Sequence, residues 1–479
     1  MDMNEGFSLY ERLAASIQAQ ISAGALRPGD RVPSVRHLSH ARQVSISTVL
    51  QAYRKLEDDG VIEARPQSGY YVRHKQRRLP EPAISSPPQQ AQSVDNSALV
   101  ANALDIANRP NSVPLATASP GPALFPAAKL QRCISGVARR HPTLATTYSF
   151  RSGHPELCRQ IARRALDWGS ELDPGEIIIT NGCMEALNLA LRCVTRPGDT
   201  IALESPAYFG LLQISESLGL KVLEIPTHPR DGLSVDAFDF ATRSMNVKAC
   251  VVVSNVGNPL GSVMPENEKR RLVALAAARD IALIEDAIYS DLYDGPLSPS
   301  LAKAYDKTGN VILCSSFSKT LAPGLRIGWM VPGRQRQQIE MLKFINSLMT
   351  SEVPQLAIAE FLASGGYDHH LRRLRRAFRE QMAKTTVAIA KYFPEGTRVS
   401  RPQGGFLLWV ELPKQIDSIV LMREAAKENI SIAPGPLFST TDRYLNFARI
   451  SCGYPWSADI ERAIRRLGEM ARMQLERAN

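Results

Sequence analysis

Residues 311–329, VILCSSFSKTLAPGLRIGW, decide the fold of this 479-residue chain. An apolar run ends in hydroxyl side chains, one lysine follows, and an arginine stands seven residues after the lysine. The pattern predicts a buried strand that delivers Lys319 into a pocket, where Ser316, Ser318 and Arg326 can hold an anion. A lysine amine attacks an aldehyde only after losing its proton, and burial beside positive charge lowers its pKa in that direction. A lysine after a strand can equally be solvated. Lys319 is therefore a candidate nucleophile only if other parts of the chain supply residues that complete its pocket.

Similar apolar runs recur from about Pro114 to the end of the chain, separated by stretches of helix length. The expected strands are Glu176–Thr180, Thr200–Glu204, Lys221–Ile225, Ala249–Ser254, Ile281–Glu285, Val311–Ser315 and Arg326–Val331. Short β-rich runs that alternate with helices indicate a doubly wound, mostly parallel sheet. Such sheets bind ligands at the carboxyl ends of their strands, so the residues after each strand are the candidates for a site.

Three of these strand ends carry residues suited to a flat, phosphorylated ligand. Gly182, Cys183 and Met184 open a helix, whose free amides and positive dipole end favour a phosphate. Tyr208 offers an aromatic face for a flat ring, and Asn258 offers an amide side chain before a proline. The alternatives are an ordinary helix start, a core tyrosine and a turn asparagine.

The strand that ends at Asp286 adds the most informative group. A buried carboxylate is costly without a cationic partner, and a protonated pyridine nitrogen is such a partner. Tyr289, three residues later, can donate a hydrogen bond to a phenolate oxygen on the same ring. The full set describes a pocket for pyridoxal 5'-phosphate (PLP) held as a Schiff base: Gly182, Tyr208, Asn258, Asp286, Tyr289, Ser316, Lys319 and Arg326.

From about Leu115 to the C terminus, the order and spacing of these motifs resemble the fold type I, aspartate-aminotransferase-like family. The resemblance implies a large domain with the doubly wound sheet and a smaller α+β domain. It implies that Lys319 forms the internal aldimine and that Asp286 pairs with the ring nitrogen. The remaining implied contacts are Tyr289 and Asn258 to the ring oxygen, Tyr208 stacked on the ring, and Ser316, Arg326 and the amides of Cys183 and Met184 on the phosphate.

The same resemblance assigns two further residues and an assembly. Arg449, in Asn446–Gly453, matches the segment whose arginine binds a substrate carboxylate, and its planar fork suits a bidentate ion pair. Tyr148 is expected to reach the phosphate of a neighbouring subunit, since the active site of this family lies at a dimer interface. A homodimer is therefore implied by the resemblance. No metal site is expected.

The N-terminal part has a different pattern. Leu9, Leu13, Ile17 and Ile21 form one helical stripe after a possible cap at Ser8. Ser34 and Ser45 precede two more short helices, and the stretch Val61–Val72 is typical of a β-hairpin. Two short helices across a tight connection, followed by a hairpin, predict a winged helix-turn-helix.

Residues 7–73 resemble the winged helix-turn-helix domain of the GntR regulators, through the motifs Pro28–Arg36, Val44–Val49, Tyr53–Leu56 and Gly60–Gly69. Residues 1–79 hold twelve lysines and arginines against eight aspartates and glutamates, which suits docking on phosphates. Where many relatives carry an arginine this chain has Ile46, which leaves the base read there open. The resemblance places six residues near DNA: Arg36, Ser45, Ser47, Thr48, Arg54 and, in the wing, Gly69.

Between the two patterns the composition becomes rich in proline, serine and glutamine. We therefore predict a DNA-binding domain over residues 1–74, a flexible linker over 75–113 and an aminotransferase-like body over 114–479. A coil over residues 80–113 would span on the order of 30 Å. A short helix over Asn96–Asn108 is expected inside the linker.

Composition limits the class and the compartment. No apolar run approaches the length of a membrane span, and the N terminus lacks a signal-peptide core, so the expected compartment is the cytoplasm. Seven scattered cysteines indicate reduced thiols rather than disulfides or a zinc site. A net charge of +10 is compatible with a nucleic-acid partner. The arginine-rich run 372–379 is either a solvated face or a second DNA-facing surface.

A GntR-type head joined to an aminotransferase-like body is the architecture of the MocR subfamily of bacterial regulators. The resemblance implies a dimeric DNA-binding regulator that senses an amino compound or PLP through the cofactor on Lys319. A catalytically active aminotransferase with an accessory head is the alternative, and a cofactor with a purely structural role is a third. Amino acids, diamines and the cofactor itself all remain open as the signal.

Overall fold

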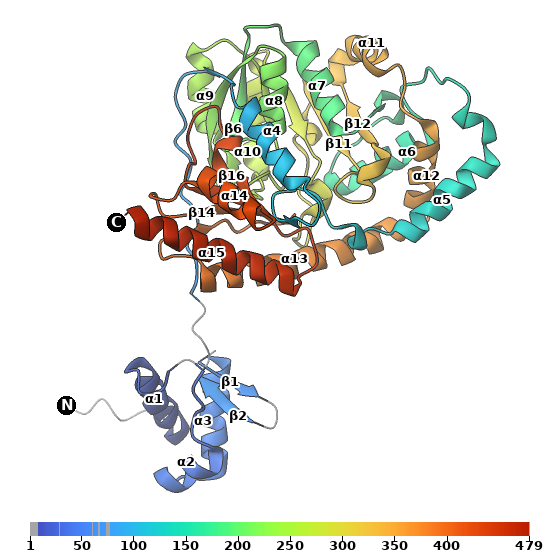
Figure 1. Ribbon diagram of the computed structural model, residues 1–479. Coiled ribbons are helices and arrows are strands. Elements are labelled where there is room, and N and C mark those ends of the chain that lie inside the picture. The colour runs from blue at the N-terminus through green and yellow to red at the C-terminus, as the bar shows by residue number, and fades with distance from the viewer. Residues whose placement is uncertain (1–7, 28, 60, 66–67, 73–76, 479) are drawn as a thin grey trace. The chain divides into compact units, whose positions relative to one another are not determined.

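The computed structural model describes residues 8–478 except 28, 60, 66–67 and 73–76. The chain separates into two compact units, Met1–Arg78 and Leu79–Asn479. Figure 1 shows helices with a small hairpin in the first unit and a large sheet covered by helices in the second. The boundary predicted at residues 74 and 75 lies outside the described residues, as do Pro28 and Gly60 of the head motifs.

The first unit is a three-helix head with a hairpin. Its elements are α1 (Leu9–Ser22), α2 (Val35–Arg42), α3 (Ile46–Asp58), β1 (Ile62–Arg65) and β2 (Gly69–Val72). Leu13 and Ile17 of α1 pack against Val49, Tyr53 and Leu56 of α3, and these side chains are buried. The Tyr53 hydroxyl donates to the carbonyl of Pro33 at 2.5 Å, which ties α3 to the residues before α2. The winged helix-turn-helix predicted from the sequence is confirmed in the described residues.

The second unit is built on a nine-stranded sheet with the order β3-β7-β6-β9-β10-β11-β12-β5, and β8 pairs with β7. Its strands are β3 (Gln92–Ser93), β5 (Ile178–Thr180), β6 (Thr200–Ser205), β7 (Lys221–His228), β8 (Gly232–Leu233), β9 (Val247–Val252), β10 (Ala282–Asp286), β11 (Val311–Ser316) and β12 (Gly328–Val331). β7, β6, β9, β10 and β11 are parallel neighbours. β12 runs antiparallel to β11, because the chain between them contains no crossover α-helix.

Both faces of this sheet are covered, as a doubly wound fold requires. Ile201 and Leu203 of β6 pack on one face with α7 (Cys183–Val194) and α8 (Phe209–Ser217). Ala202, between them, packs on the other face with α9 (Val235–Ser244) and α10 (Glu266–Ala278). This alternation follows from the two-residue period of a strand.

Further helices flank the sheet at its β5 end, at the right of Figure 1. They are α5 (Ala127–Arg140), α6 (Pro155–Ala165), α11 (Arg336–Ser347) and α12 (Glu352–Ala363).

A smaller α+β domain follows. Its antiparallel sheet has the order β13-β14-β17-β16, formed by β13 (Arg398–Val399), β14 (Leu407–Glu411), β17 (Phe447–Ser451) and β16 (Ala433–Pro434). It packs with α13 (Gly366–Tyr392), α14 (Ser418–Lys427) and α15 (Ala458–Ala478), and β15 (Ile430–Ser431) pairs with β4 (Val113–Pro114). Because Arg449 lies in the middle of β17, this sheet fixes its position.

The flexible linker predicted over residues 75–113 differs from the structure. From Leu79 onward the segment lies on the body: β3 pairs with β7, and α4 (Ser97–Ala107) buries Val100, Ala103 and Ile106. The amide of Val399 also donates to the carbonyl of Pro80 at 2.9 Å. Apolar residues at intervals anchor a segment whose average composition is that of a coil. The short helix expected over Asn96–Asn108 is present.

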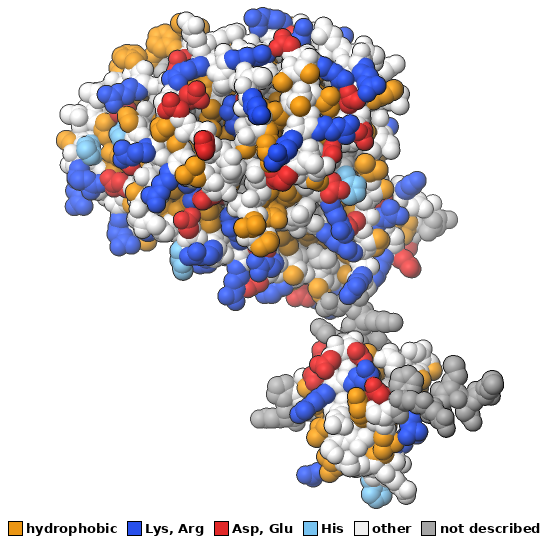
Figure 2. All heavy atoms as spheres, turned by 180° about the vertical axis from the view of Figure 1, so that it is seen from behind, with side chains coloured by type: hydrophobic (Ala, Val, Ile, Leu, Met, Phe, Trp, Pro, Cys, Tyr) orange, Lys and Arg blue, Asp and Glu red, His pale blue; other side chains and the backbone are white. Residues whose placement is uncertain are grey.

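The arginine-rich run lies on α13, and several of its side chains contact the body. Arg375 donates to the carbonyl of Asp291 at 2.8 Å, Arg379 pairs with Asp294, and Arg376 pairs with Glu380 at 2.9 Å. Figure 2 shows positive and negative side chains interspersed over the visible face of the body. In the part of the chain that the structure describes, no helix is long and apolar enough to cross a membrane.

Candidate functional site

A cavity of about 90 Å³ lies at the carboxyl ends of β10 and β11 and at the start of α7. It brings together most of the residues predicted from the sequence. The predicted residues that line it are Cys183, Met184, Tyr208, Asn258, Asp286, Tyr289, Ser316, Ser318, Lys319 and Arg326. Gly182 lies beside this lining, next to Arg326.

Lys319 lies just beyond the end of β11 and points into the cavity. Its Nζ donates to the carbonyl oxygen of Ala118 at 2.6 Å. Burial lowers the pKa of Lys319 to about 8, and the positive charge of Arg449 contributes to the same shift. A substantial fraction of this amine is therefore neutral near physiological pH, as a nucleophilic lysine requires.

Asp286 is the buried carboxylate at the end of β10. The amide of Ile288 donates to its Oδ1 at 3.1 Å, and the Cys183 thiol lies 3.5 Å from the same oxygen. Burial nevertheless raises the pKa of Asp286 to about 6. No lysine or arginine among the described residues forms an ion pair with it. A carboxylate in this condition is suited to a cation brought by a ligand.

The anion cradle is formed by the start of α7, Arg326 and two serines. Gly182 caps α7 at a φ of +83°, and a Cβ there would lie 2.2 Å from Nη2 of Arg326. Nη1 of Arg326 donates to the Ser318 hydroxyl at 3.3 Å, while the Ser316 hydroxyl accepts from the amide of Ser318 at 3.2 Å. The free amides at the start of α7 and this guanidinium are thus combined at one end of the cavity.

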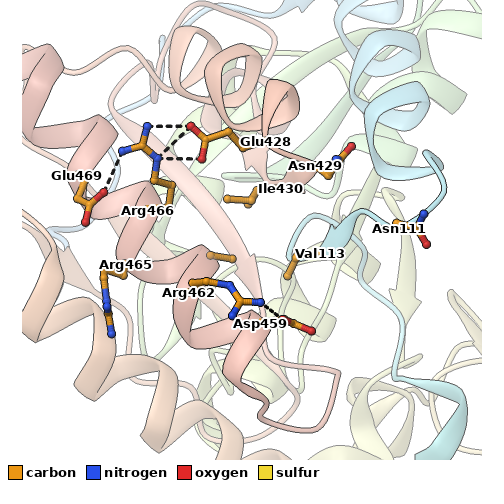
Figure 3. A pocket seen from close by; sticks show the side chains of 11 residues that line it. Asn111, Val113, Glu428, Asn429, Ile430, Asp459, Arg462, Arg465, Arg466 and Glu469 are labelled. Atoms are coloured by element: carbon orange, nitrogen blue, oxygen red, sulfur yellow. Dashed lines mark hydrogen bonds and ion pairs between the residues drawn. The ribbon is translucent and has the colours of Figure 1, made fainter.

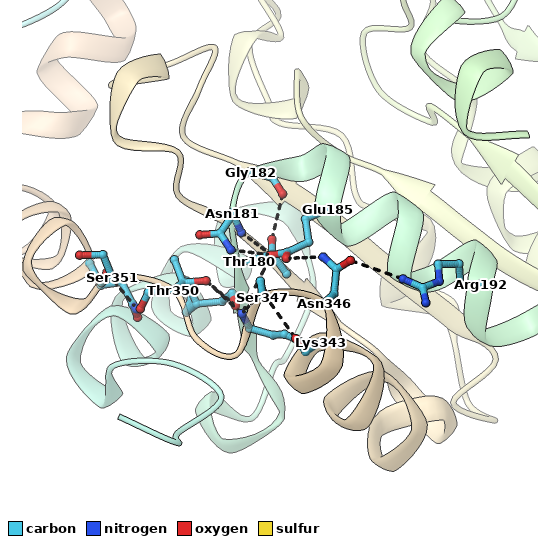
Figure 4. Close-up of polar contacts among 12 residues, drawn as sticks. Thr180, Asn181, Gly182, Glu185, Arg192, Lys343, Asn346, Ser347, Thr350 and Ser351 are labelled. Atoms are coloured by element: carbon cyan, nitrogen blue, oxygen red, sulfur yellow. Dashed lines mark hydrogen bonds and ion pairs between the residues drawn. The ribbon is translucent and has the colours of Figure 1, made fainter. Parts of the chain in front are cut away.

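A buried polar network between α7 and α11 supports the residues next to this cradle (Figure 4). The Glu185 carboxylate accepts from the amide of Asn181 at 2.6 Å and from Asn346 at 3.1 Å, and it lies 4.0 Å from Nζ of Lys343. Although burial opposes it, the hydrogen bond from the Asn181 amide contributes most to a lowered pKa of Glu185. Glu185 therefore remains charged and fixes the residue before Gly182.

Arg449 approaches the cavity from β17 of the smaller domain. It is 1% exposed, and it donates to Oδ1 of Asn258 at 3.1 Å and to the carbonyl of Ala116 at 2.6 Å. Its Nε is buried without a hydrogen-bond partner. Burial lowers the pKa of Arg449, with no carboxylate to oppose the effect. An unpaired, buried guanidinium nitrogen is suited to a carboxylate that arrives with a ligand.

Two aromatic residues complete the site. Tyr208 lies in the cavity wall beside Phe209, with ring centroids 5.0 Å apart. Tyr289 is buried, and its ring lies 6.0 Å from that of Phe406. Burial raises the pKa of both phenols, so both remain hydrogen-bond donors at neutral pH.

Tyr148 is the predicted site residue that lies away from the cavity. Its side chain is 73% exposed and stacks on Phe150, with ring centroids 6.2 Å apart. The contact of Tyr148 with a neighbouring subunit therefore stays a prediction.

A larger cavity, of about 520 Å³, lies on the smaller domain beside α15 (Figure 3). Most of its charged side chains pair with one another: Arg466 pairs with Glu428 at 2.8 Å and with Glu469 at 2.9 Å, and Arg462 pairs with Asp459. The residues predicted from the sequence do not line it. Volume alone therefore does not identify the functional site.

In the head, the residues predicted to contact DNA are on the surface of α2, α3 and the hairpin. Arg36, Ser45, Ser47, Arg54 and Gly69 are exposed, and Thr48 is half-buried. Ser45 also caps α3, because its hydroxyl accepts from the amide of Thr48 at 3.1 Å. Ile46, at the start of α3, is 50% exposed. An exposed isoleucine at this position suits an apolar contact in a groove, while the DNA contacts themselves stay predictions.

Some residues of the site could not be found by reading strand ends. The carbonyl of Ala118, which accepts from Lys319, and the network around Glu185 and Lys343 come from distant segments. Glu204, near the end of β6, lies behind the lining: it accepts from the amide of Val253, a lining residue, at 3.1 Å, and its buried Oε1 has no partner. Its place at a strand end was the only signal in the sequence.

Comparison with known proteins agrees with both units. Residues 127–467 match the family model "Aminotransferase class I and II", and residues 9–72 match "Bacterial regulatory proteins, gntR family". The uncharacterized HTH-type transcriptional regulator YjiR of Escherichia coli is 38% identical, over 98% of this chain and 99% of its own. The 2-aminoadipate transaminase of Thermus thermophilus is 30% identical, over 76% of this chain and 91% of its own.

Solved structures give the same result for the body. The multiple substrate aminotransferase from Thermococcus profundus superposes with a TM-score of 0.72 at 28% identity, over 79% of this chain and 95% of its own. LysN, the alpha-aminoadipate aminotransferase from Thermus thermophilus, has a TM-score of 0.71 at 27% identity, over 80% of this chain and 100% of its own. That structure was determined with N-(5'-phosphopyridoxyl)-L-leucine.

Proposed function

This chain belongs to the aminotransferase class I and II family and to the MocR subfamily of GntR regulators, and we propose that it binds DNA under the control of an amino compound. The observation that carries this proposal is the extent of the similarity. The regulator YjiR matches 98% of the chain, head included, whereas the 2-aminoadipate transaminase matches 76%. A protein that acts on the chromosome also belongs in the cytoplasm.

The cofactor of the body is PLP. The charges of the cavity fit this group: among the described residues, Asp286 is a buried carboxylate that forms no ion pair, and the cradle of Arg326 and the α7 amides holds no anion. When bound, PLP supplies an aldehyde that a primary amine can attack. Lys319 would hold that aldehyde covalently, and Asp286 would hold the ring nitrogen in its protonated form.

The other residues would orient the group. Tyr208 would present its ring to the cofactor ring, while Asn258 and Tyr289 would donate hydrogen bonds to its oxygen. The phosphate would lie between Arg326, Ser316, Ser318 and the amides of Cys183 and Met184. Arg449 would bind the carboxylate of the incoming ligand through its unpaired Nε.

Sensing follows from two changes at this site. A ligand amine that took the place of Lys319 would free this side chain, and a ligand carboxylate would pair with Arg449. Both changes occur against α4, which belongs to the segment that continues the chain from the head. A ligand shifts the protein between two states only as far as its affinities for them differ, so these contacts must differ between the two states.

A homodimer is part of the proposal. Exposed apolar side chains lie on α11 at Met341, Phe344 and Ile345, and others lie at Tyr148 and Phe150. Figure 2 shows hydrophobic side chains at the upper left edge of the body, the end where Figure 1 draws α11. A second copy of the chain would cover them, and two heads would then bind two half-sites.

Genuine transamination is the second candidate. Burial lowers the pKa of Lys319 to about 8, so this amine can take up and release a proton near neutral pH. Sustained production of a keto acid from an amino acid and an acceptor would favour the enzyme. A single turnover that stops when the cofactor is consumed would favour the regulator.

Replacing Lys319 tests the sensing mechanism. We expect Lys319→Ala to lose the visible absorbance of the lysine-linked cofactor and to lose the effect of the amino compound on DNA affinity. Lys307→Ala, at an exposed lysine, is the matched control and should keep both. Effector-dependent DNA binding that survives unchanged in Lys319→Ala would contradict the mechanism and would favour a purely structural cofactor.

A further inference from the structure

A second cavity, of about 190 Å³, adjoins the cofactor site and shares Ala118, Tyr208 and Lys319 with it. Arg449 also lines it. A ligand whose amine meets Lys319 and whose carboxylate meets Arg449 therefore has this cavity as the space for its side chain.

A large part of the wall of this cavity is apolar, and one helix contributes four of its residues. Val100, Ala103, Leu104 and Ala107 of α4 line one part, and Phe209 and Leu437 line another. These residues can pack against a hydrocarbon side chain and offer it no hydrogen bond. Burying apolar surface against these residues contributes to affinity, whereas a polar side chain packed on them would lose hydration. The uncharged hydrogen-bonding side chains of the lining are Thr117, Ser119 and Tyr208.

The charges of the cavity decide which ligands fit. Among the described residues that line it, the charged ones are Lys319 and Arg449, which already meet the amine and one carboxylate. A second carboxylate would have no cation in this wall, and the second ammonium of a diamine would have no carboxylate. An unpaired charge is expensive to bury.

One further polar group points to a ligand. Thr117 lines this cavity, and its Oγ1 is buried without a hydrogen-bond partner, as is Nε of Arg449. Both atoms can donate a hydrogen bond to a carboxylate oxygen, which supports a ligand that carries the carboxylate of an amino acid.

We propose that the ligand is an amino acid with one carboxylate and an apolar side chain, and that α4 selects that side chain. This inference rests on the proposed function of the Lys319 site. Its consequence is that occupancy acts directly on α4, and through it on residues 79–113, the segment that follows the head in the chain.

The experiment compares three ligands on the full-length, PLP-loaded chain. L-leucine, L-glutamate and 1,4-diaminobutane are titrated while the visible absorbance of the cofactor is followed. We expect leucine to bind at least about tenfold more tightly than either of the others, and to slow hydrogen exchange of the α4 amides. Tighter binding of glutamate or the diamine would overturn the ligand class and leave the sensor function standing. Failure of all three to bind would overturn the sensor function and this inference with it.

A charge placed on α4 gives a second test. Leu104 lines the cavity yet is 47% exposed, so Leu104→Arg should fold. We expect this variant to bind leucine about tenfold more weakly and glutamate more tightly than the unaltered chain. Asn102→Arg, on an exposed position of the same helix outside the cavity, is the control and should keep the original preference. An unchanged preference in Leu104→Arg would overturn the role of α4.

Discussion

The anion cradle can be tested by adding one methyl group. In Gly182→Ala, the new Cβ would lie 2.2 Å from Nη2 of Arg326, so the guanidinium must move away from the start of α7. Losing charge-assisted hydrogen bonds of this kind costs about 1.5–3 kcal/mol, which corresponds to about 10- to 150-fold weaker PLP binding. The backbone at φ +83° adds strain of about 1–3 kcal/mol, which lowers stability without involving the phosphate.

The chain supplies a control that separates these two effects. Gly198 also has a positive φ, of +91°, but a Cβ there meets nothing within 4 Å. Gly198→Ala should therefore lose stability without losing affinity for PLP. Pyridoxal, which lacks the phosphate, should bind Gly182→Ala as well as it binds the unaltered chain.

The assay is a titration of the cofactor-free chain with PLP and with pyridoxal, followed by visible absorbance, beside thermal unfolding of both variants. The reasoning is refuted if Gly182→Ala binds PLP within about twofold of the unaltered chain. It is equally refuted if pyridoxal binding weakens as much as PLP binding, because the loss would then not concern the phosphate.

Three further outcomes are expected. Because burial lowers the pKa of Lys319 to about 8, the rate of PLP attachment to the cofactor-free chain should rise with pH and level off above about pH 8; a rise that continues to pH 10 would mean a solvated lysine. Burial raises the pKa of Glu204 in the folded state to about 8, whereas in the unfolded chain this carboxyl has its ordinary, lower pKa. Between these two pKa values only the folded state holds the proton, so the free energy of unfolding falls as pH rises through 8. Glu204→Gln lacks that loss, and its melting temperature should exceed that of the unaltered chain by a margin that grows between pH 5 and pH 9; a constant margin would contradict the shift. Ser45→Ala removes the cap on α3 and should destabilise that helix by about 1 kcal/mol, seen as about fivefold faster hydrogen exchange of its amides. Gln51→Ala, at an exposed position of the same helix away from the cap, should not speed the exchange.

The positions of the strand ends could be predicted from the sequence, because the burial pattern of a strand is visible in a few consecutive residues. β10 and β11 are short β-rich runs, and their last residues deliver Asp286 and Lys319. The direction of β12 was not readable in the same way, since it depends on whether the chain crosses over between strands. The antiparallel β12 follows from the lack of a crossover helix after Lys319.

The linker shows where composition misleads. Proline, serine and glutamine predict a coil, yet Leu79, Val94, Val100, Ala103 and Ile106 are buried on the body. A few buried side chains suffice to hold the segment when the body that they pack against is already folded. That surface is formed by residues outside the segment, so the local sequence pattern does not reveal it. The same limit applies to Ala118, whose carbonyl reaches Lys319 from 201 positions away.

The central claim is that this chain is a ligand-controlled DNA-binding regulator. The most direct test is a footprint of the purified, PLP-loaded chain on the DNA upstream of its own gene and its neighbours, with and without amino acid, at about physiological ionic strength. The account predicts discrete protected half-sites on one face of the duplex, with protection that changes when the amino acid is added. Protection that is absent, or that is uniform along the DNA and lost with modest salt, would contradict it and leave the aminotransferase as the better description.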